Sequence, residues 1–396
     1  MVQLKVKIFQ FKEGGYKVEL ELKDNFDNTI ERLEAWWNCE IIDRACVQIV
    51  VKKSNENKFN KYKKEENQSE KLNSENNLDS RQKRLKNKWM DVEFQVEKNA
   101  KLLEEQLYFG EAFPYYMPNL GPDLWSTLYG TELQFGKNTS WAEHHIDSWE
   151  KFNSKPANFE PNFNNQYWNT IEEMMEFSLE LGKNKYITAL PDLHPGGDLL
   201  TALRGPEKLC LDLAMNQDLI KEINNKLIDF YPKIYNKIYS LIKEYNLGSV
   251  TWVPFYHRAK AYVVSCDLSA LISPAMFKEV FLPGIKKQVN FLDKSLYHLD
   301  GPDSLRHLDT LLEIEELDGI QWLYGAGNGP STKWIDVFKK IQESGKCNHI
   351  YVDTVKEIEL ILDELKPHGL LFTLKNKDLS KKEAEKAIKM VEKKSK

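Results

Sequence analysis

The stretch SLYHLDGPDSLRHLDTLLEIEELDGIQWLY, residues 295–324, contains two short apolar runs separated by a segment of helical length. Residues 295–299 form the first run and residues 319–324 the second. Apolar strands that alternate with helices are typical of a parallel sheet buried on both faces. The stretch therefore predicts one strand–helix–strand unit of such a sheet.

The same alternation recurs along the chain and gives eight strand candidates in all. Eight strand–helix units predict an α/β fold of the closed (β/α)₈ TIM-barrel type. An open doubly wound sheet stays the alternative, because AYVVSCD (261–267) is an extra strand candidate. The other runs are IIDRACVQIVV (41–51), AFPYYM (112–117), KYITAL (185–190), SVTWVPF (249–255), HIYV (349–352) and GLLFTL (369–374).

An N-terminal unit over residues 1–40 is expected before a barrel domain over residues 41–396. Residues 4–11 and 16–22 alternate apolar and polar on either side of a Gly-Gly pair, which predicts a hairpin. A helix is expected to follow from Asn28.

Residues 52–88 are predicted to form a polar insertion in the barrel. The segment interleaves Lys with Glu and carries little that could fill a core, so we expect a solvated excursion that ends at a Lys/Arg-rich helix. Two later helix starts are marked by capping boxes, Thr354 with Glu357 and Ser380 with Glu383.

Composition excludes several classes of protein. The 55 Lys and Arg against 60 Asp and Glu give a formal net charge of −5, so no basic field is available for nucleic acid or an anionic membrane. No signal peptide or apolar membrane span is visible, which predicts a cytoplasmic protein. Five widely spaced cysteines argue against a disulfide framework. The GAGN segment at 325–328 lacks a phosphate-binding pattern, so neither ATP nor NAD is expected.

Polar side chains cluster just after the predicted strands. In a barrel this end gathers residues from many strands around one pocket, so it is where a site is expected. The candidates are Asp192 and His194 after 185–190, Tyr256, His257 and Arg258 after 249–255, and His298 with Asp300 at 298–300.

A motif upstream of residue 295 is specific enough to suggest a family. The segment CDLSALISPAMFKEVFLPGI (266–285) resembles the pattern (I/L)SPxxFxExxLP of the uroporphyrinogen decarboxylase superfamily, with an acid, Asp267, at the preceding strand end. Together with residues 297–330 it is similar in particular to anaerobe-type members grouped with corrinoid-dependent methyltransferases. The resemblance implies a (β/α)₈ barrel and one of two activities.

Decarboxylases of this superfamily hold their polycarboxylate tetrapyrrole with an Arg-rich segment after the first strand. Here the matching segment is DRACVQIV with Arg44 alone. In a decarboxylase, Arg204, Arg258 and Lys260 would bind acid groups, and Asp267 or Asp123 would stabilise a protonated intermediate. Decarboxylation of uroporphyrinogen or a related carboxylate is therefore the alternative function.

Methyltransferases of the superfamily bind zinc through His-x-Cys and a distant Cys, and His298-Leu299-Asp300 stands at that place. His298 and Asp300 lie two apart on a strand, so both face one side and could share zinc or another divalent metal. His257 or Cys266 could complete that site. A metal-free role, in which His298 binds substrate by a hydrogen bond, stays open.

The preferred function is methyl transfer between a small methylated compound and a corrinoid (cobalamin) protein or thiol acceptor. The resemblance implies that a partner protein carries the corrinoid. A non-catalytic tetrapyrrole- or corrinoid-binding protein is the second alternative, and a homodimer is left open. The predicted catalytic residues are His298, Asp300 and Asp267; the predicted substrate-binding residues are Asp123, Asp192, His194, Tyr256, Arg258, Trp322 and Tyr324.

Overall fold

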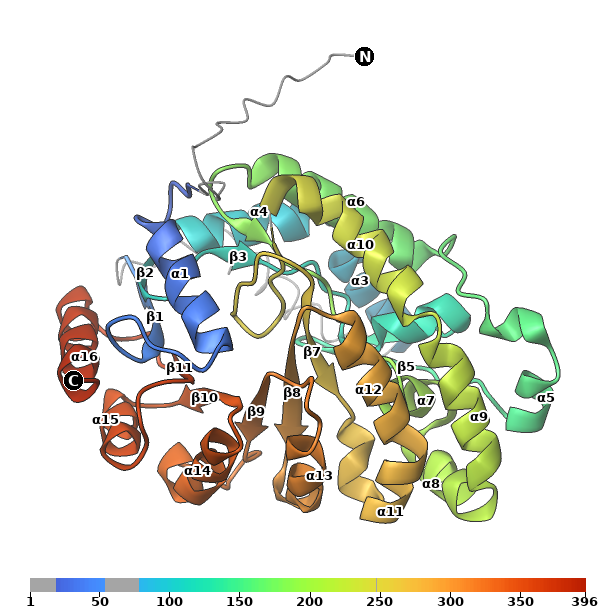
Figure 1. Cartoon of the computed structure of the whole chain (residues 1–396). Helices are drawn as coiled ribbons and strands as arrows, with labels where there is room; N and C mark the ends of the chain where they lie inside the picture. The colour runs from blue at the N-terminus through green and yellow to red at the C-terminus, as the bar shows by residue number, and fades with distance from the viewer. Residues whose placement is uncertain (1–18, 54–77, 247) are drawn as a thin grey trace.

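The computed structural model describes residues 19–53, 78–246 and 248–396, which form a mixed α/β fold around a mostly parallel sheet (Figure 1). The sheet has seven strands in the order β2-β1-β11-β10-β9-β8-β7. Only the pairing of β1 with β2 is antiparallel. The strands are β1 Cys46–Lys52, β2 Gln106–Gly110, β7 Ala261–Ser265, β8 Lys294–Asp300, β9 Gly319–Leu323, β10 Cys347–Val352 and β11 Leu370–Leu374.

The predicted closed barrel is not confirmed, because the described part of this sheet has two open edges, at β2 and β7. Two further predicted strands pair with each other instead. They are β3 Tyr115–Tyr116 and β6 Ile187–Thr188, which form a separate parallel pair. A third small sheet pairs β4 Leu133–Phe135 with β5 Ser140–Ala142.

Near residue 255, a different run forms the strand from the one predicted. The run at 249–255 joins no sheet ladder in the described structure, and Ser249 makes only an isolated bridge with His257. The extra candidate at 261–267 supplies β7 instead. Buried aromatic and β-branched residues occur in both runs, so composition alone could not separate a strand from a loop packed into the core.

The helices surround the sheet in an arc (Figure 1). α12 packs on β7, α14 on β9 and β10, α15 on β10, and α16 on β1 and β2. Both predicted capping boxes are present, at the first residues of α15 and α16. The principal helices are α3 Leu78–Trp89, α4 Val92–Glu104, α6 Gln166–Leu181, α7 Gly197–Arg204, α8 Pro206–Met215, α9 Gln217–Ile228, α10 Tyr231–Asn246, α12 Leu282–Phe291, α14 Ile335–Glu343, α15 Val355–Glu364 and α16 Lys381–Lys394; shorter ones are α5 Trp149–Asn153, α11 Pro274–Met276 and α13 Leu308–Leu312.

Alternate strand residues bury against two different clusters. Tyr297 and Leu299 of β8 belong to the large cluster shared with the surrounding helices. Leu296 lies on the opposite side of β8, which we call the inner face, and joins the cluster shared with α1 Phe26–Trp37 and the segment 249–257. The period of two along a strand explains this division.

α1 covers the amino ends of the strands. The indole of Trp36 donates to the carbonyl of Asn348 at 3.1 Å, and that of Trp37 donates to the carbonyl of Tyr256 at 3.2 Å. The helix predicted from Asn28 is confirmed and begins two residues earlier, at Phe26. The predicted N-terminal hairpin falls mainly on residues 1–18, which lie outside the described residues.

The end of the predicted insertion is built into the fold. α3 packs beside β4, where the indole of Trp89 donates to the carbonyl of Gly136 at 2.9 Å. Residues 54–77 lie outside the described residues.

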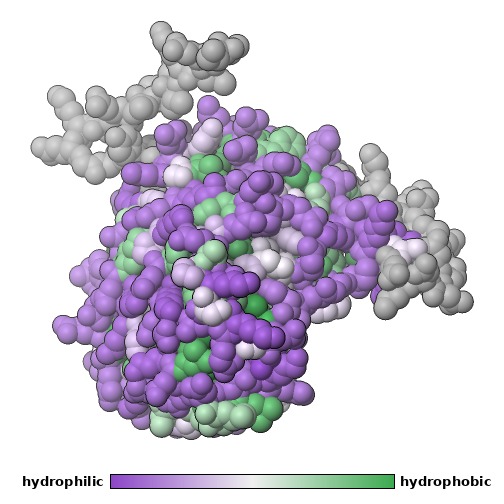
Figure 2. All heavy atoms as spheres, turned by 90° about the vertical axis from the view of Figure 1, so that its right-hand side faces the viewer, coloured by the Kyte–Doolittle hydropathy of each residue, from purple (hydrophilic) through white to green (hydrophobic). Residues whose placement is uncertain are grey.

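Hydrophilic residues cover most of the face in Figure 2, with separate hydrophobic patches between them. Within the described ranges, every helix is too short or too polar to cross a bilayer.

Candidate active site

Polar side chains occupy the inner face toward the carboxyl ends of the strands. His298 of β8 is in register with Ser265 of β7 on one side and with Gln321 of β9 on the other. Gln321 is in turn in register with His349 of β10. Because these residues stand opposite one another on neighbouring strands, they form a polar row across the sheet.

One end of this row is fixed by main-chain carbonyl groups. Gln48 of β1 donates from Nε2 to the carbonyls of Pro254 and Glu111, the second at 3.3 Å. A carbonyl oxygen can only accept, so the amide nitrogen of Gln48 must face these groups and its Oε1 must face away. Oε1 accepts from the hydroxyl of Thr373 of β11 at 2.6 Å. The hydroxyl of Thr373 is thereby committed as a donor.

The donor and the acceptor of each further hydrogen bond in the row then follow in turn. His349 Nε2 lies 2.9 Å from Thr373 Oγ1, whose proton is already used, so His349 donates from Nε2. The neutral ring therefore accepts at Nδ1, which lies 2.6 Å from Gln321 Nε2. Gln321 Oε1 in turn accepts from His298 Nδ1 at 2.6 Å. We call the row His298–Gln321–His349–Thr373–Gln48 the relay.

The relay leaves Nε2 of His298 with a free lone pair. That atom has no hydrogen-bond partner among the described residues, and the residue keeps 8% of its surface exposed. Burial lowers the pKa of His298, and burial together with the neighbouring His298 lowers the pKa of His349 to about 3. Both rings are therefore neutral near pH 7, and His298 can accept a proton or a ligand at Nε2.

A second histidine is held in the charged form beside the relay. His194 Nδ1 lies 2.9 Å from Ser265 Oγ, and its Nε2 lies 3.3 Å from Asp192 Oδ1. Ser265 donates to Asp198 Oδ2 at 2.7 Å, so His194 Nδ1 must donate to Ser265. Burial alone would lower the pKa of His194, but the hydrogen bond to Asp192 and the nearby carboxylates raise it to about 9.

Three further carboxyl groups, those of Asp123, Asp267 and Asp300, lie near His194 and His298. Asp267 donates from its backbone N–H to Asp198 Oδ1 at 2.7 Å. Desolvation and the charges of Asp198 and Asp300 raise the pKa of Asp267 to about 7, against the opposing effect of His194. Burial raises the pKa of Asp123, which also experiences the charges of His194 and Asp198. Asp123, Asp267 and Asp300 thus share an electrostatic environment with His194.

The indole of Trp252 lies near both histidines. Its ring centroid is 4.9 Å from that of His298 and 6.5 Å from that of His194. Trp252 belongs to the segment 249–257, whose Pro254 carbonyl anchors the relay. Its Nε1 is buried with no hydrogen-bond partner among the described residues. The segment thus supplies both an aromatic wall and the anchor of the relay.

Several predicted site residues lie elsewhere. His257 bonds Glu34 of α1 through Nδ1 at 2.9 Å, and the Arg258 backbone N–H donates to the same carboxylate at 3.1 Å. Tyr256 is fully buried beside α1. All three therefore lie at the amino ends of the strands, because the strand assumed to precede them does not form.

Trp322 and Cys266 lie on the helix-facing side of the sheet. Trp322 is buried against Trp334, with ring centroids 5.2 Å apart, and is in register with Leu299 rather than with His298. Cys266 is buried, and burial raises the pKa of its thiol well above the usual value. Tyr324 lies just beyond β9, where its hydroxyl donates to Asp353 at 3.4 Å.

The residues predicted to hold a metal do not form one site. His257 is bonded to Glu34 at the opposite ends of the strands from Asp300, and Cys266 lies on the other side of the sheet from His298. In the described part of the chain, no three His, Cys, Asp or Glu side chains gather in a geometry that could hold a metal ion.

Sequence reasoning missed the relay residues Gln48, Gln321, His349 and Thr373, as well as Asp198, Ser265 and Trp252. One signal was available for four of them, because each is a polar residue within a nearly apolar strand. A buried polar group needs a partner. Such interruptions in successive strands therefore indicate a network.

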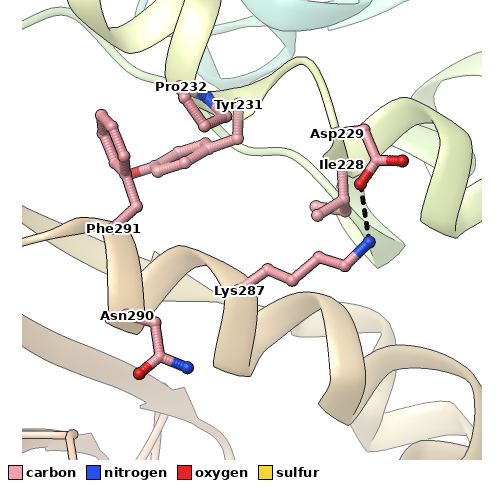
Figure 3. Close-up of a pocket in the computed structure, with 7 residues that line it drawn as sticks. All are labelled: Ile228, Asp229, Tyr231, Pro232, Lys287, Asn290 and Phe291. Atoms are coloured by element: carbon pink, nitrogen blue, oxygen red, sulfur yellow. Dashed lines mark hydrogen bonds and ion pairs between the residues drawn. The ribbon is translucent and has the colours of Figure 1, made fainter.

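A surface pocket lies apart from this site, between the α9–α10 junction and α12 (Figure 3). Its wall includes the ring of Tyr231, which packs edge-on against Phe291. Its polar rim is the ion pair of Asp229 with Lys287 at 2.6 Å. The rim pair is already satisfied, and the pocket holds none of the histidines or acids described above.

Comparisons with known proteins found a structural likeness and no sequence match. No protein-family model matches the chain, and no curated protein matches its sequence. Among solved structures, a methyltransferase from Methanosarcina mazei is similar, with a TM-score of 0.54 and 12% identity. The match covers 92% of this chain and 98% of that chain. At this identity the likeness shows a shared fold over nearly the whole chain.

Proposed function

We propose that the protein is a methyltransferase whose site lies at the carboxyl ends of β7 and β8. It would move a methyl group between a small methylated compound and either a thiol or the cobalt of a corrinoid carried by a partner protein. The observation that carries the proposal is the free Nε2 lone pair of His298 beside an indole and a group of aspartates. The shared fold and the resemblance at residues 266–285 support it.

His298 would act as the proton acceptor. An acceptor X–H bound near Nε2 gives its proton to His298, X forms a bond to the methyl carbon, and the bond from carbon to the leaving group breaks with its electron pair. Asp198 and Asp300 favour the resulting imidazolium, since their charges raise the pKa of His298 against the effect of burial. The corrinoid, when bound, supplies a cobalt that gives or receives the methyl group.

Trp252 and the aspartates suggest which methyl compound fits. The charges of Asp192, Asp198 and Asp267 act on the imidazolium of His194, and the charge of Asp300 acts on His298. An indole face such as that of Trp252 attracts onium groups. The charges that shift the pKa values of Asp267, His194 and His298 come from aspartates and a histidine. A neutral or cationic methyl compound is therefore favoured over an anionic one.

The placement of the arginines counts against the alternative of a polycarboxylate decarboxylase. Arg44 is buried and forms a two-pronged pair with Glu111, both contacts at 2.8 Å. Arg204 forms a similar pair with Asp212. Arg258 lies at the amino ends of the strands. No guanidinium among these three is left to bind substrate carboxylates at the site.

We also propose that the fold is a (β/α)₈ barrel in which β3 and β6 stand between the two open edges, β2 and β7. Two contacts support this arrangement. The Leu190 N–H donates to the carbonyl of Val250 at 2.9 Å, and the Ala261 N–H donates to Ser249 Oγ at 3.2 Å. Segment 249–257 would then fill the gap at β7 in place of direct strand pairing.

The proposed function is tested with the full-length protein and free methylcobalamin. Demethylation of the cobalt is followed by absorbance in the presence of a thiol. The reverse reaction is followed with trimethylammonium, thioether and methoxy compounds as methyl donors and reduced, demethylated cobalamin, cob(I)alamin, as the acceptor. We expect methyl transfer by the native protein and by His145→Ala, whose ring bonds the carbonyl of Tyr129 away from the site. Transfer should be abolished in His298→Ala.

Two outcomes would contradict the proposal. Release of carbon dioxide from uroporphyrinogen on the order of 1 per second or faster, without methyl transfer, would establish the decarboxylase. Tight corrinoid binding with neither reaction would establish the non-catalytic binding protein.

A further inference from the structure

Two cysteines meet at the amino ends of the strands, opposite the proposed site. Cys39 follows the last turn of α1, and Cys347 is the first residue of β10. The thiol of Cys347 donates to the carbonyl of Asp318 at 3.3 Å, and Cys39 packs against the buried cluster to which Cys347 belongs. Cys39 Sγ also lies 3.2 Å from the carbonyl of Gly345, two residues before Cys347. The two cysteines therefore pack in one cluster although 308 positions separate them in the sequence.

The backbone at Cys39 is unusual for a cysteine. Its φ of 53° lies in the left-handed region, which favours glycine at the end of a helix. A side chain there costs on the order of 1 kcal/mol relative to glycine. Strain of this kind is tolerated where the surrounding structure holds the residue, and it directs attention to what the side chain does.

The two thiols differ in reactivity and access. The neighbouring Cys347 and the charges of Lys294 and Lys346 lower the pKa of Cys39, against the effect of burial. Burial, followed by the neighbouring Cys39, raises the pKa of Cys347 well above its usual value. Cys39 is half-buried, whereas Cys347 is fully buried. Cys39 is thus the nucleophile that an oxidant reaches first, and Cys347 stands beside it as a resolving thiol.

We propose that Cys39 and Cys347 are a redox-active pair that a peroxide converts to a disulfide. The sulfur of Cys39 attacks one peroxide oxygen, the O–O bond breaks, and Cys39 becomes a sulfenic acid as one water leaves. The sulfur of Cys347 then attacks the sulfenyl sulfur, its proton leaves with the hydroxyl group as a second water, and the S–S bond forms. Two thiols are oxidised and one peroxide is reduced to two waters.

The disulfide would join α1 covalently to β10. α1 is otherwise held to β10 by the hydrogen bond from Trp36 to Asn348 and by buried apolar contacts. The cross-link therefore tightens the cover over the amino ends of the strands, and a thiol reductant releases it. Neither residue belongs to the proposed methyl-transfer site, so the pair stands independently of that function.

The experiment treats the reduced full-length protein with hydrogen peroxide and counts thiols after unfolding without reductant. We expect the count to fall from five to three, and mass spectrometry of a non-reduced digest to show the peptide pair containing Cys39 and Cys347. Dithiothreitol should restore five thiols.

Two variants make the test specific. Cys39→Gly suits the left-handed backbone, so it should fold and should fail to form the disulfide. Cys210→Ser, which removes a half-buried cysteine on α8, should still form it. Oxidation of native Cys39 to a sulfinic or sulfonic acid without the cross-link would overturn the proposal. So would a disulfide that persists in Cys39→Gly or one that joins two molecules.

Discussion

His298 Nδ1 and Gln321 Oε1 lie 2.6 Å apart on neighbouring strands, with the imidazole donating and the amide accepting. This single contact decides which nitrogen of His298 is free. Its direction is set four hydrogen bonds away, by carbonyl groups that can only accept from Gln48. The basicity of the proposed catalytic group therefore depends on residues that touch no substrate.

Replacing Gln321 with Glu should raise the pKa of His298. The native pKa of His298 is lowered by burial, and a carboxylate in place of the amide would stabilise the imidazolium. We expect the NMR titration of the His298 ring to move to higher pH by one unit or more, about 1.4 kcal/mol per unit. Gln288→Glu, at a buried glutamine of α12, is the matched control and should leave the titration in place. An unchanged His298 titration in Gln321→Glu would show that the contact does not control the ring.

Replacing His349 with Gln should weaken the fall in unfolding free energy as the pH decreases below about 6.5. The pKa of His349 is about 3 in the folded protein and about 6.5 in the unfolded chain, so only the unfolded chain takes up this proton between those values. The stability contribution is complete above about pH 6.5 and is lost as the pH falls toward 3, by up to about 1.4 kcal/mol per pH unit. Urea unfolding between pH 4.5 and 7.5 measures the slope. Parallel curves for native and variant protein would contradict the expectation.

His194→Gln should lower the unfolding free energy more at low pH than at high pH. The pKa of His194 is raised to about 9, so its charged form stabilises the fold fully below about pH 6.5, and this stability is lost as the pH rises through 9. We expect the variant to be less stable than the native protein at pH 6 and to differ less at pH 10. A stability difference that grows with pH would be inconsistent with an imidazolium at this position.

Arg44→Met tests whether this arginine is structural. The substitution leaves the carboxylate of Glu111 buried, with Arg32 Nη1 3.9 Å away as its remaining guanidinium. Breaking a buried pair from one side typically costs about 3–5 kcal/mol of unfolding free energy. The control Lys52→Met removes an exposed pair with Asp378 and should cost no more than about 1 kcal/mol. Equal midpoints for the two variants in urea would place Arg44 outside the core.

His298→Ala and Asp300→Asn test whether the pair acts as one unit. The two residues lie on the same face of β8, and the charge of Asp300 raises the pKa of His298. We expect each substitution to reduce methyl transfer strongly. Asp300→Asn should change the melting temperature little, whereas His298→Ala should lower it, because the buried Oε1 of Gln321 loses its donor. The double variant should be barely worse than either single one, because effects within a unit are not additive. Near-native turnover in either single variant would remove that residue from the mechanism.

The sequence predicted most of the fold because its signals are local. Apolar runs alternate with helical segments, and the capping boxes at Thr354 and Ser380 mark helix starts that the structure confirms. The segment 249–255 misled the prediction, since aromatic and β-branched residues suit both a strand and a buried loop. That one error moved Tyr256, His257 and Arg258 to the wrong ends of the strands.

The candidate site was less accessible to sequence reasoning because it depends on register. His298, Asp267 and His194 could be placed near strand ends from their positions alone. The connection from His298 through Gln321 to His349 depends on which residues of separate strands stand opposite each other. No local pattern gives that alignment, so a buried network across strands emerges only from the three-dimensional arrangement.

The anchoring of the relay at the Pro254 carbonyl has a consequence for how the chain tolerates mutation. Every amino acid carries the same carbonyl group, so no substitution at position 254 can delete the acceptor that sets the orientation of Gln48 and, through it, of the imidazoles. The assignment of donors and acceptors along the relay thus depends on a main-chain group rather than on a side chain at position 254. Mutations in segment 249–257 can therefore change its conformation, whereas the pattern of donors and acceptors along the relay stays the same.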